Sequence, residues 1–219
     1  MPRWLALAAA AALPWVARGA EGTKAQAAPK TPADAGLVDA TTLVPDLVVD
    51  LRYATADNFM KRKVYPDGAR CFLREESARR LARAAEALRR QGFRLKVYDC
   101  YRPLSVQWEM WKVFPKPGYV ADPRTGSNHN RGGAVDLTLV TLDGKEVEMP
   151  TPYDTFSPAA HHGYAGGSEA SRKHREVLRA AMVAQGFTPN RMEWWHYDLP
   201  QPTRYPVLDV PFTGEGPKR

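Results

Sequence analysis

Hydrophobic residues recur along this chain with two main spacings, and the longer spacing predicts three helices. Intervals of three and four residues indicate helices over residues 74–91, 101–114 and 168–185. Gly92 and Gly186 directly follow two of these stretches. Glycine commonly ends a helix because it tolerates the left-handed conformation, so these boundaries are well marked.

The shorter spacing, in which hydrophobic and other residues alternate, predicts strands. Such stretches, rich in β-branched and aromatic residues, cover residues 46–53, 93–99, 133–140 and 192–199. The sequence Leu-Asp-Gly-Lys at 142–145 indicates a hairpin turn after the third of them. Because strands and helices are interspersed and a hairpin is present, we expect one α+β domain with a mainly antiparallel sheet and flanking helices.

The amino-terminal region has the features of a signal peptide over residues 1–19. Arg3 provides the positive charge, and the apolar run from 5 to 16 is too short to span a bilayer. Residues 20–36 lack hydrophobic periodicity and are expected to be a flexible linker, so that the folded domain would occupy 37–219. We therefore expect an exported protein, periplasmic or extracellular, with no stable membrane span after signal cleavage.

The net charge of +7 is compatible with anionic neighbours such as cell-wall polymer, or simply with a solvated basic surface. No basic stripe interleaved with aromatic residues indicates nucleic-acid binding. The chain has two cysteines, Cys71 and Cys100. In an oxidising compartment we expect them to form a disulfide, with two free buried thiols as the alternative.

The segment from Ser127 to Asp136 contains the first candidate for metal chemistry. His129 precedes a pair of glycines and Asp136 follows it in the expected strand. Glycines permit a tight turn, so the imidazole and the carboxylate could reach one point. Both groups are suitable zinc ligands. The alternative is that a loop histidine and a strand aspartate are unrelated surface residues.

Glu193 and His196 lie together in an aromatic stretch near the end of the chain. His196 would add a third ligand, and a set of three ligands leaves one position for water, as in catalytic zinc sites. Glu193 is then the candidate general base. Residues three apart face opposite sides of a regular strand, so the two side chains share a site only if the chain bends between them. The alternative is a core strand whose histidine is merely hydrogen-bonded.

Arg102 lies where an expected strand ends and a helix begins. Its planar guanidinium could hold a substrate carboxylate or polarise a scissile carbonyl. For this residue taken alone, a structural ion pair is the alternative.

These three segments together resemble the VanX-type D-alanyl-D-alanine dipeptidases, zinc enzymes related to D,D-carboxypeptidases and to the hedgehog signalling fold. The likeness runs from about residue 50 to 211 and begins with the early stretch 51–59. It includes the pattern Ser-x-His-x-x-Gly-x-Ala-x-Asp over residues 127–136 and the ending Glu-x-Trp-His over 193–196. Separate matches in the same order are more specific than any one of them.

The resemblance implies hydrolysis of D-alanyl-D-alanine and a role for each matching residue. It implies one Zn²⁺ held by His129, Asp136 and His196. Glu193 would be the general base, and Arg102 would stabilise the carbonyl oxygen as it becomes an oxyanion. Ser127 and Asp154 would lie near the free amine of a small dipeptide substrate.

Two features depart from the family pattern. Cys100 stands where the resemblance leads us to expect glycine, and the export signal differs from cytoplasmic enzymes of this type. Two other functions therefore remain in view: a D,D-carboxypeptidase or endopeptidase that acts on peptidoglycan fragments, and a non-catalytic, metal-stabilised module that binds the cell wall. A purely structural zinc needs no base, so the presence of Glu193 argues against the binding module.

Overall fold

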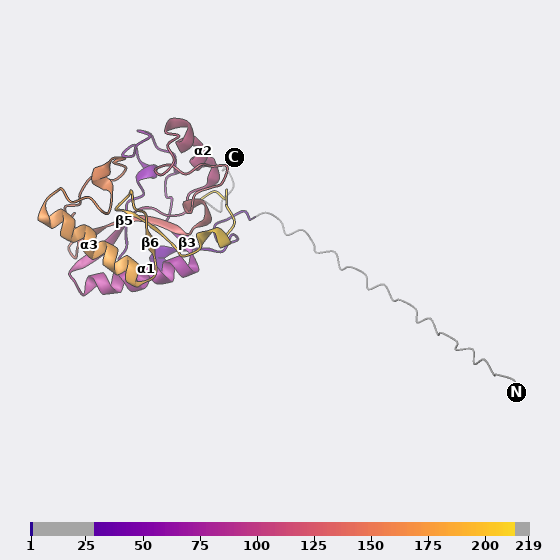
Figure 1. Ribbon diagram of the computed structural model, residues 1–219, viewed down its shortest axis with the longest axis horizontal. Coiled ribbons are helices and arrows are strands. Elements are labelled where there is room, and N and C mark those ends of the chain that lie inside the picture. The colour runs from indigo at the N-terminus through magenta and orange to yellow at the C-terminus, as the bar shows by residue number, and fades with distance from the viewer. Residues whose placement is uncertain (2–28, 213–219) are drawn as a thin grey trace.

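The computed structural model describes Met1 and residues 29–212 (Figure 1). The expected signal peptide and the first part of the expected linker lie outside the described residues. Residues 31–36 form hydrogen-bonded turns, and the first strand, β1 (Leu37–Asp39), follows them directly. Within residues 29–212, no helix combines the length and the apolar composition needed to cross a bilayer.

The main sheet has five strands in the order β2-β4-β5-β7-β6. Their bounds are β2 (Val48–Val49), β4 (Phe93–Asp99), β5 (Ala134–Thr141), β6 (Thr188–Pro189) and β7 (His196–Asp198). Only the pairing of β2 with β4 is parallel, and the other three pairings are antiparallel. A separate antiparallel pair joins β1 to β3 (Phe72–Arg74). The expected α+β domain with a mainly antiparallel sheet is confirmed.

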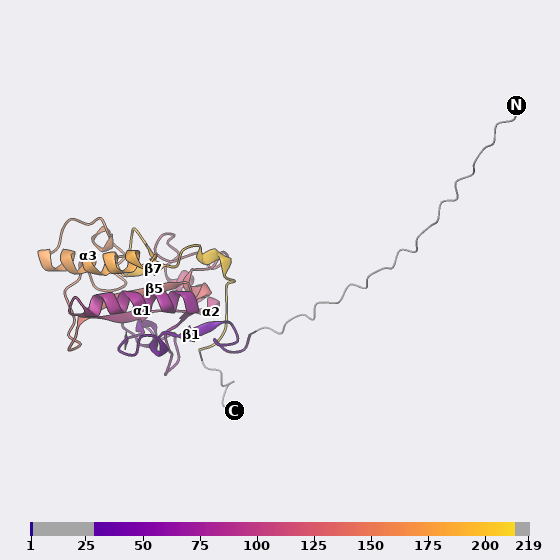
Figure 2. The same cartoon turned by 90° about the horizontal axis from the view of Figure 1, so that it is seen from below.

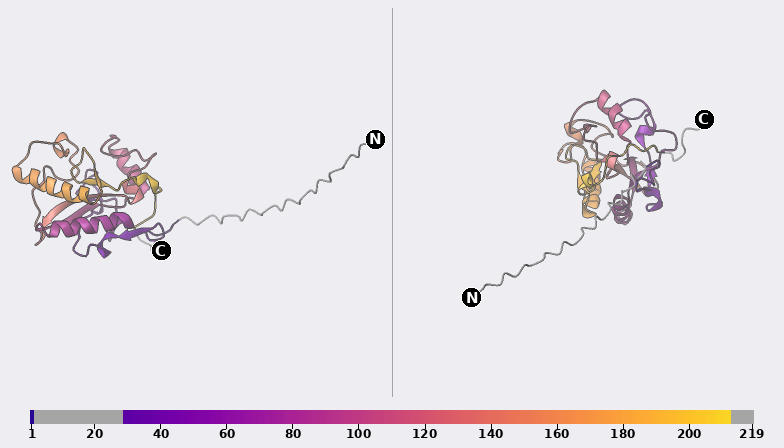
Figure 3. Two further views of the ribbon diagram at one scale, coloured as in Figure 1. Left: turned by 60° about the horizontal axis from the view of Figure 1, so that its bottom comes forward. Right: turned by 90° about the vertical axis from the view of Figure 1, so that its right-hand side faces the viewer.

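Two long helices, α1 (Glu75–Arg89) and α3 (Glu169–Ala184), lie side by side and pack on the sheet (Figures 1 and 2). Helix α2 (Leu104–Val113) lies apart from this pair (Figure 3). Short 3-10 helices cover Ala40–Thr42, Arg52–Ala54, His129–Arg131, Pro158–Ala160 and Pro202–Arg204. The packing of α1 and α3 leaves the ends of β4, β5 and β7 to build the candidate site.

Two expected strands are much shorter than the hydrophobic pattern indicates. Within the stretch 46–53, only the two residues of β2 form a strand, and a 3-10 helix begins at Arg52. The stretch 192–199 is a strand only over His196–Asp198. Before it, the backbone N–H of Trp194 donates to the carbonyl of Ala160, so this residue bonds to a loop rather than to the sheet. Aromatic residues therefore fill the core here without lying in a strand.

Candidate active site

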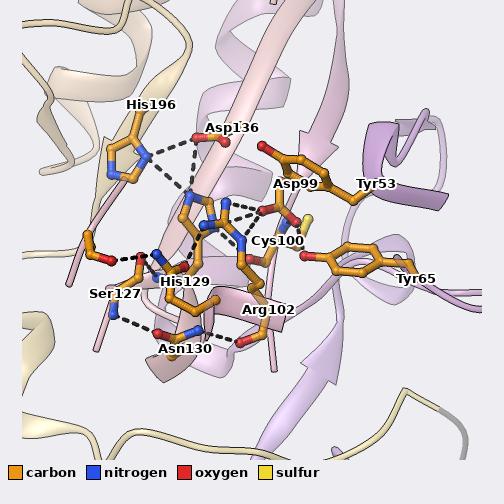
Figure 4. A network of polar contacts seen from close by, with 12 residues as sticks. Tyr53, Tyr65, Asp99, Cys100, Arg102, Ser127, His129, Asn130, Asp136 and His196 are labelled. Carbon is orange, nitrogen blue, oxygen red and sulfur yellow. Dashed lines mark hydrogen bonds and ion pairs between the residues drawn. The ribbon is translucent and has the colours of Figure 1, made fainter. Parts of the chain in front are cut away.

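The side chains of His129, Asp136 and His196 point toward one another (Figure 4). Their ligand atoms all lie within 4.8 Å of one another. Nδ1 of His196 lies 2.9 Å from Oδ1 of Asp136, and Nε2 of His129 lies 3.2 Å from the same oxygen. The sheet explains part of this convergence, because Asp136 on β5 is paired directly with His196 on β7.

The outer nitrogens of both histidines have acceptors that fix which nitrogen faces the site. Nδ1 of His129 donates to the backbone carbonyl of Cys100 at 2.7 Å. Nε2 of His196 donates to Oδ1 of Asp198 at 3.0 Å, and this carboxylate also accepts from Asn128. Such partners orient metal-binding histidines and leave the inner nitrogens as ligands. The residues present therefore fit a metal ion with two imidazole ligands and one carboxylate ligand.

The electrostatics of this cluster favour a positive charge close to the carboxylates of Asp136 and Asp198. Burial opposes ionisation of Asp136, but the two imidazoles outweigh it and hold the pKa of this carboxyl well below its usual range. Burial likewise opposes charge on His196, yet Asp198 and Asp136 raise the pKa of its imidazole well above the usual value. Both shifts have the direction expected of a cation site.

Glu193 reaches the same cavity because the chain turns before β7 begins. The backbone N–H of Glu193 donates to the carbonyl of Asn190, and that of His196 donates to the carbonyl of Glu193. This is the bend that a shared site requires of residues three apart. The side-chain amide of Asn190 donates to Oε2 of Glu193 at 2.8 Å. Burial raises the pKa of Glu193 to about 8.

Arg102 is buried beside the candidate metal ligands and paired with Asp99 (Figure 4). Its Nε and Nη2 donate to Oδ2 of Asp99 at 2.9 and 2.5 Å, while Nη1 donates to Gln107 at 2.7 Å. A register shift at the end of β4 precedes Asp99 and helps to aim its side chain. The ion pair does not use every N–H of the guanidinium, so Arg102 can be both fixed by Asp99 and available to a substrate.

Asp154 and Ser127 line the same cavity, which has a volume of about 220 Å³. Asp154 is half-buried and has a positive φ of 58°. Its carboxylate accepts from the backbone N–H of Phe59 at 3.0 Å and from the hydroxyl of Tyr53 at 3.1 Å. Burial raises the pKa of Asp154 to about 7. Ser127 Oγ accepts from the backbone N–H of His129, which leaves its own hydroxyl proton for another acceptor.

Cys71 and Cys100 are joined by a disulfide, with a Cα–Cα separation of 5.2 Å. Both residues are fully buried. Cys100 is also the residue whose carbonyl accepts from His129, so the disulfide adjoins the candidate metal site.

The sequence reasoning did not identify several residues that hold the site together. Asp198 lies two residues after His196, on the same face of the strand, and that spacing was a usable signal. Asp99 lies three residues before Arg102, but its pairing with Arg102 depends on the shape of the strand end. Tyr153 directly precedes Asp154 and Asn190 lies three residues before Glu193, but both lie in loops, where no periodic pattern predicts their hydrogen bonds.

Two histidines and a carboxylate that converge beside a buried glutamate and arginine define a metallopeptidase type of site. The comparison with known families agrees with this class. Residues 33–213 match the family described as D-ala-D-ala dipeptidase, Peptidase_M15. The chain belongs to this family, and it is a peptidase.

Individual relatives of the chain are also named D-alanyl-D-alanine dipeptidases. The chain is 37% identical over 177 residues to the D-alanyl-D-alanine dipeptidase of Escherichia coli K12, covering 81% of this chain and 91% of that protein. It is 34% identical to the D-alanyl-D-alanine dipeptidase of Enterococcus faecium, over 71% of this chain and 89% of the relative. A Streptomyces coelicolor protein of the same name is 33% identical, over 74% and 92%.

Proposed function

We propose that this protein hydrolyses D-alanyl-D-alanine to free D-alanine and uses zinc held by His129, Asp136 and His196. The observation that carries the proposal is that these three residues, Glu193 and Asp154 all line the same small cavity. Pockets for drug-sized ligands typically measure roughly 300–1,000 Å³. A cavity of about 220 Å³ suits a smaller substrate such as a dipeptide.

Zinc at these ligands would polarise the scissile carbonyl and lower the pKa of a water molecule. Glu193 removes a proton from the attacking water while the water oxygen bonds to the carbonyl carbon. One of its oxygens is held by Asn190, which leaves the other for this proton. A base with a pKa of about 8 is well matched to neutral pH, and Glu193 then gives the proton to the leaving amine as the C–N bond breaks.

Arg102 stabilises the negative charge that develops on the carbonyl oxygen. Asp99 and Gln107 fix its guanidinium in advance, so little reorganisation is needed during the reaction. Asp154 accepts hydrogen bonds from the substrate's ammonium, and the hydroxyl of Ser127 is a further polar group of the same cavity.

The substrate is proposed to be a free dipeptide rather than a longer peptidoglycan fragment. A dipeptide carries its ammonium within two residues of its carboxylate, so the ammonium can face Asp154. An extended substrate has a neutral amide in place of that ammonium. A buried carboxylate without its partner costs about 1–3 kcal/mol.

The test compares D-alanyl-D-alanine with N-acetyl-D-alanyl-D-alanine, in the wild type and in Asp154→Asn. We expect acetylation to lower kcat/KM by roughly ten- to a hundredfold in the wild type and by less in the variant. Equal rates on both substrates in the wild type would support a D,D-carboxypeptidase instead. Loss of activity with a chelator and its recovery with zinc test the metal.

We also propose that the protein is exported to the periplasm or the extracellular space, where peptidoglycan fragments are found. The signal-peptide pattern of residues 1–19 supports this location. The disulfide between Cys71 and Cys100 also supports it, because such bonds persist mainly in oxidising compartments. Fractionation of cells that express the full chain, with mass measurement of the mature amino terminus, tests the proposal.

A further inference from the structure

The two oxygens of Asp136 have different surroundings. Oδ1 faces His196 Nδ1 at 2.9 Å and His129 Nε2 at 3.2 Å. Oδ2 accepts a hydrogen bond of 2.8 Å from the hydroxyl of Tyr153. One oxygen is therefore directed at the candidate metal position, while the other is occupied by a protein donor.

The ring of Tyr153 is held by its aromatic neighbours. Its centroid lies 4.7 Å from that of Tyr98 and 5.3 Å from that of Trp195, the residue next to His196. A ring that packs against other rings has little freedom to swing away from Asp136. The hydrogen bond is thus built into the packing between β4, the turn before β7 and the loop that carries Tyr153.

We propose that Tyr153 is a positioning residue that keeps Asp136 a one-oxygen ligand of the metal. A carboxylate that bound through both oxygens would occupy a position that a catalytic site leaves open. The hydrogen bond to Oδ2 disfavours that arrangement and fixes the orientation of Oδ1. This inference rests on the metal site of the proposed function.

Tyr153 also directly precedes Asp154, the proposed acceptor of the substrate's ammonium. Asp154 accepts a hydrogen bond of 3.0 Å from the backbone N–H of Phe59, which does not involve Tyr153. Its other donor, the hydroxyl of Tyr53, lies 3.5 Å from the hydroxyl of Tyr153, a long contact compared with the 2.8 Å hydrogen bond from Tyr153 to Asp136. Removing the Tyr153 hydroxyl should therefore disturb the metal site and leave the ammonium site largely intact. This separation distinguishes a role at the metal from a general loosening of the loop.

The experiment measures zinc affinity by competition with a chromophoric chelator for the wild type, Tyr153→Phe and Tyr98→Phe. Tyr98→Phe is the matched control, because it removes a hydroxyl from the ring that packs against Tyr153 and that hydroxyl has no hydrogen bond to Asp136. Loss of an outer partner of a metal ligand typically weakens metal binding by about 10- to 100-fold. We expect this loss in Tyr153→Phe and an unchanged zinc affinity in Tyr98→Phe.

The second readout is the visible spectrum of the cobalt-substituted proteins, which reports the number of coordinating atoms. We expect Tyr153→Phe to shift toward a higher coordination number and to keep the wild-type KM for the dipeptide at saturating zinc. Wild-type zinc affinity in Tyr153→Phe would overturn the proposal. Equal losses in both variants would also overturn it, because ring packing and not the hydroxyl would then be responsible. If the wild type itself does not bind zinc, the metal part of the proposed function fails instead.

Discussion

The two sides of the candidate site are built in different ways. Asp136 and His196 lie on adjacent strands, β5 and β7, and are paired directly in the sheet. Asp154 lies in an irregular loop with a positive φ and is held by single hydrogen bonds from Tyr53 and Phe59. For these two ligands the metal side therefore depends on a backbone ladder, while the substrate side depends on individual side chains and turns.

This difference suggests that the two sides of the cavity have different roles, one in the chemical step and the other in substrate recognition. Chemistry requires ligands and a base that stay within a fraction of an ångström of their positions, and the paired strands β5 and β7 provide that rigidity for Asp136 and His196. Recognition of one end of a substrate can depend on a loop, whose sequence varies more easily than that of a strand. Changes on the metal side should therefore act mainly on kcat, and changes in the loop that carries Asp154 mainly on KM.

The largest expected effect is on the metal side, in Glu193→Gln, in the turn that leads into β7. The amide keeps the volume of the side chain but cannot accept the proton of the attacking water. We expect kcat to fall by at least about 10²–10⁴. Metal analysis should show the wild-type zinc content, since Glu193 is not among the three ligands. A variant with near-normal kcat would place the general base elsewhere.

Arg102→Lys should have the next largest effect. Lysine keeps the positive charge but loses the planar fork that Asp99 and Gln107 hold in place. Removing one donor to an oxyanion typically costs about 10²–10³ in kcat. We expect Arg102→Lys to be nearly as inactive as Arg102→Ala, and kinetic comparison of the two variants checks this. Recovery of most of the rate by lysine would mean that Arg102 acts only as a general positive charge.

The loop side should respond in binding, and with a defined pH dependence. Because burial raises the pKa of Asp154 to about 7, its carboxylate is ionised above that pH and protonated below it. Dipeptide affinity should therefore fall as the pH drops from above 7 to below 7. Calorimetry on Glu193→Gln avoids hydrolysis and the titration of Glu193 during the measurement. Adding Asp154→Asn should weaken binding at high pH by roughly ten- to a hundredfold and remove this pH dependence. An unchanged pH dependence in the double variant would assign it to another group.

The smallest expected effect on catalysis comes from removing the disulfide in Cys71→Ser/Cys100→Ser. The bond closes a loop with a sequence separation of 29, which corresponds to about 3.6 kcal/mol of stability in the loop-entropy estimate. We expect denaturant unfolding to show a loss of this order, while kcat changes little, because backbone hydrogen bonds also hold Cys71 and the residue after Cys100. Two alkylatable thiols in the non-reduced, exported wild-type protein would contradict the disulfide itself.

Local patterns predicted the regular elements well where packing and periodicity agree. The strand 93–99 occurs as β4 with the same bounds, and the helix expected over 74–91 occurs as α1 over Glu75–Arg89. The prediction of a strand over all of 192–199 was wrong, because the aromatic residues there are buried by loops as well as by the sheet and only His196–Asp198 is a strand. A run of hydrophobic residues indicates that the segment is buried. It does not indicate whether the segment pairs with a strand or packs against a loop.

The sequence by itself determined the candidate ligands, the base and the arginine, because their residue types and spacing carry the chemistry and resemble a known family. Only the tertiary structure decided how Glu193 and His196 share a site, since that depends on the turn at Asn190. It also decided which groups orient the ligands: the carbonyl of Cys100, the carboxylate of Asp198 and the hydroxyl of Tyr153. Asp198 lies only two residues after His196, but Cys100 and Tyr153 lie 29 and 17 residues from the ligands they orient, and hydrogen bonds over such separations leave no periodic trace in a sequence.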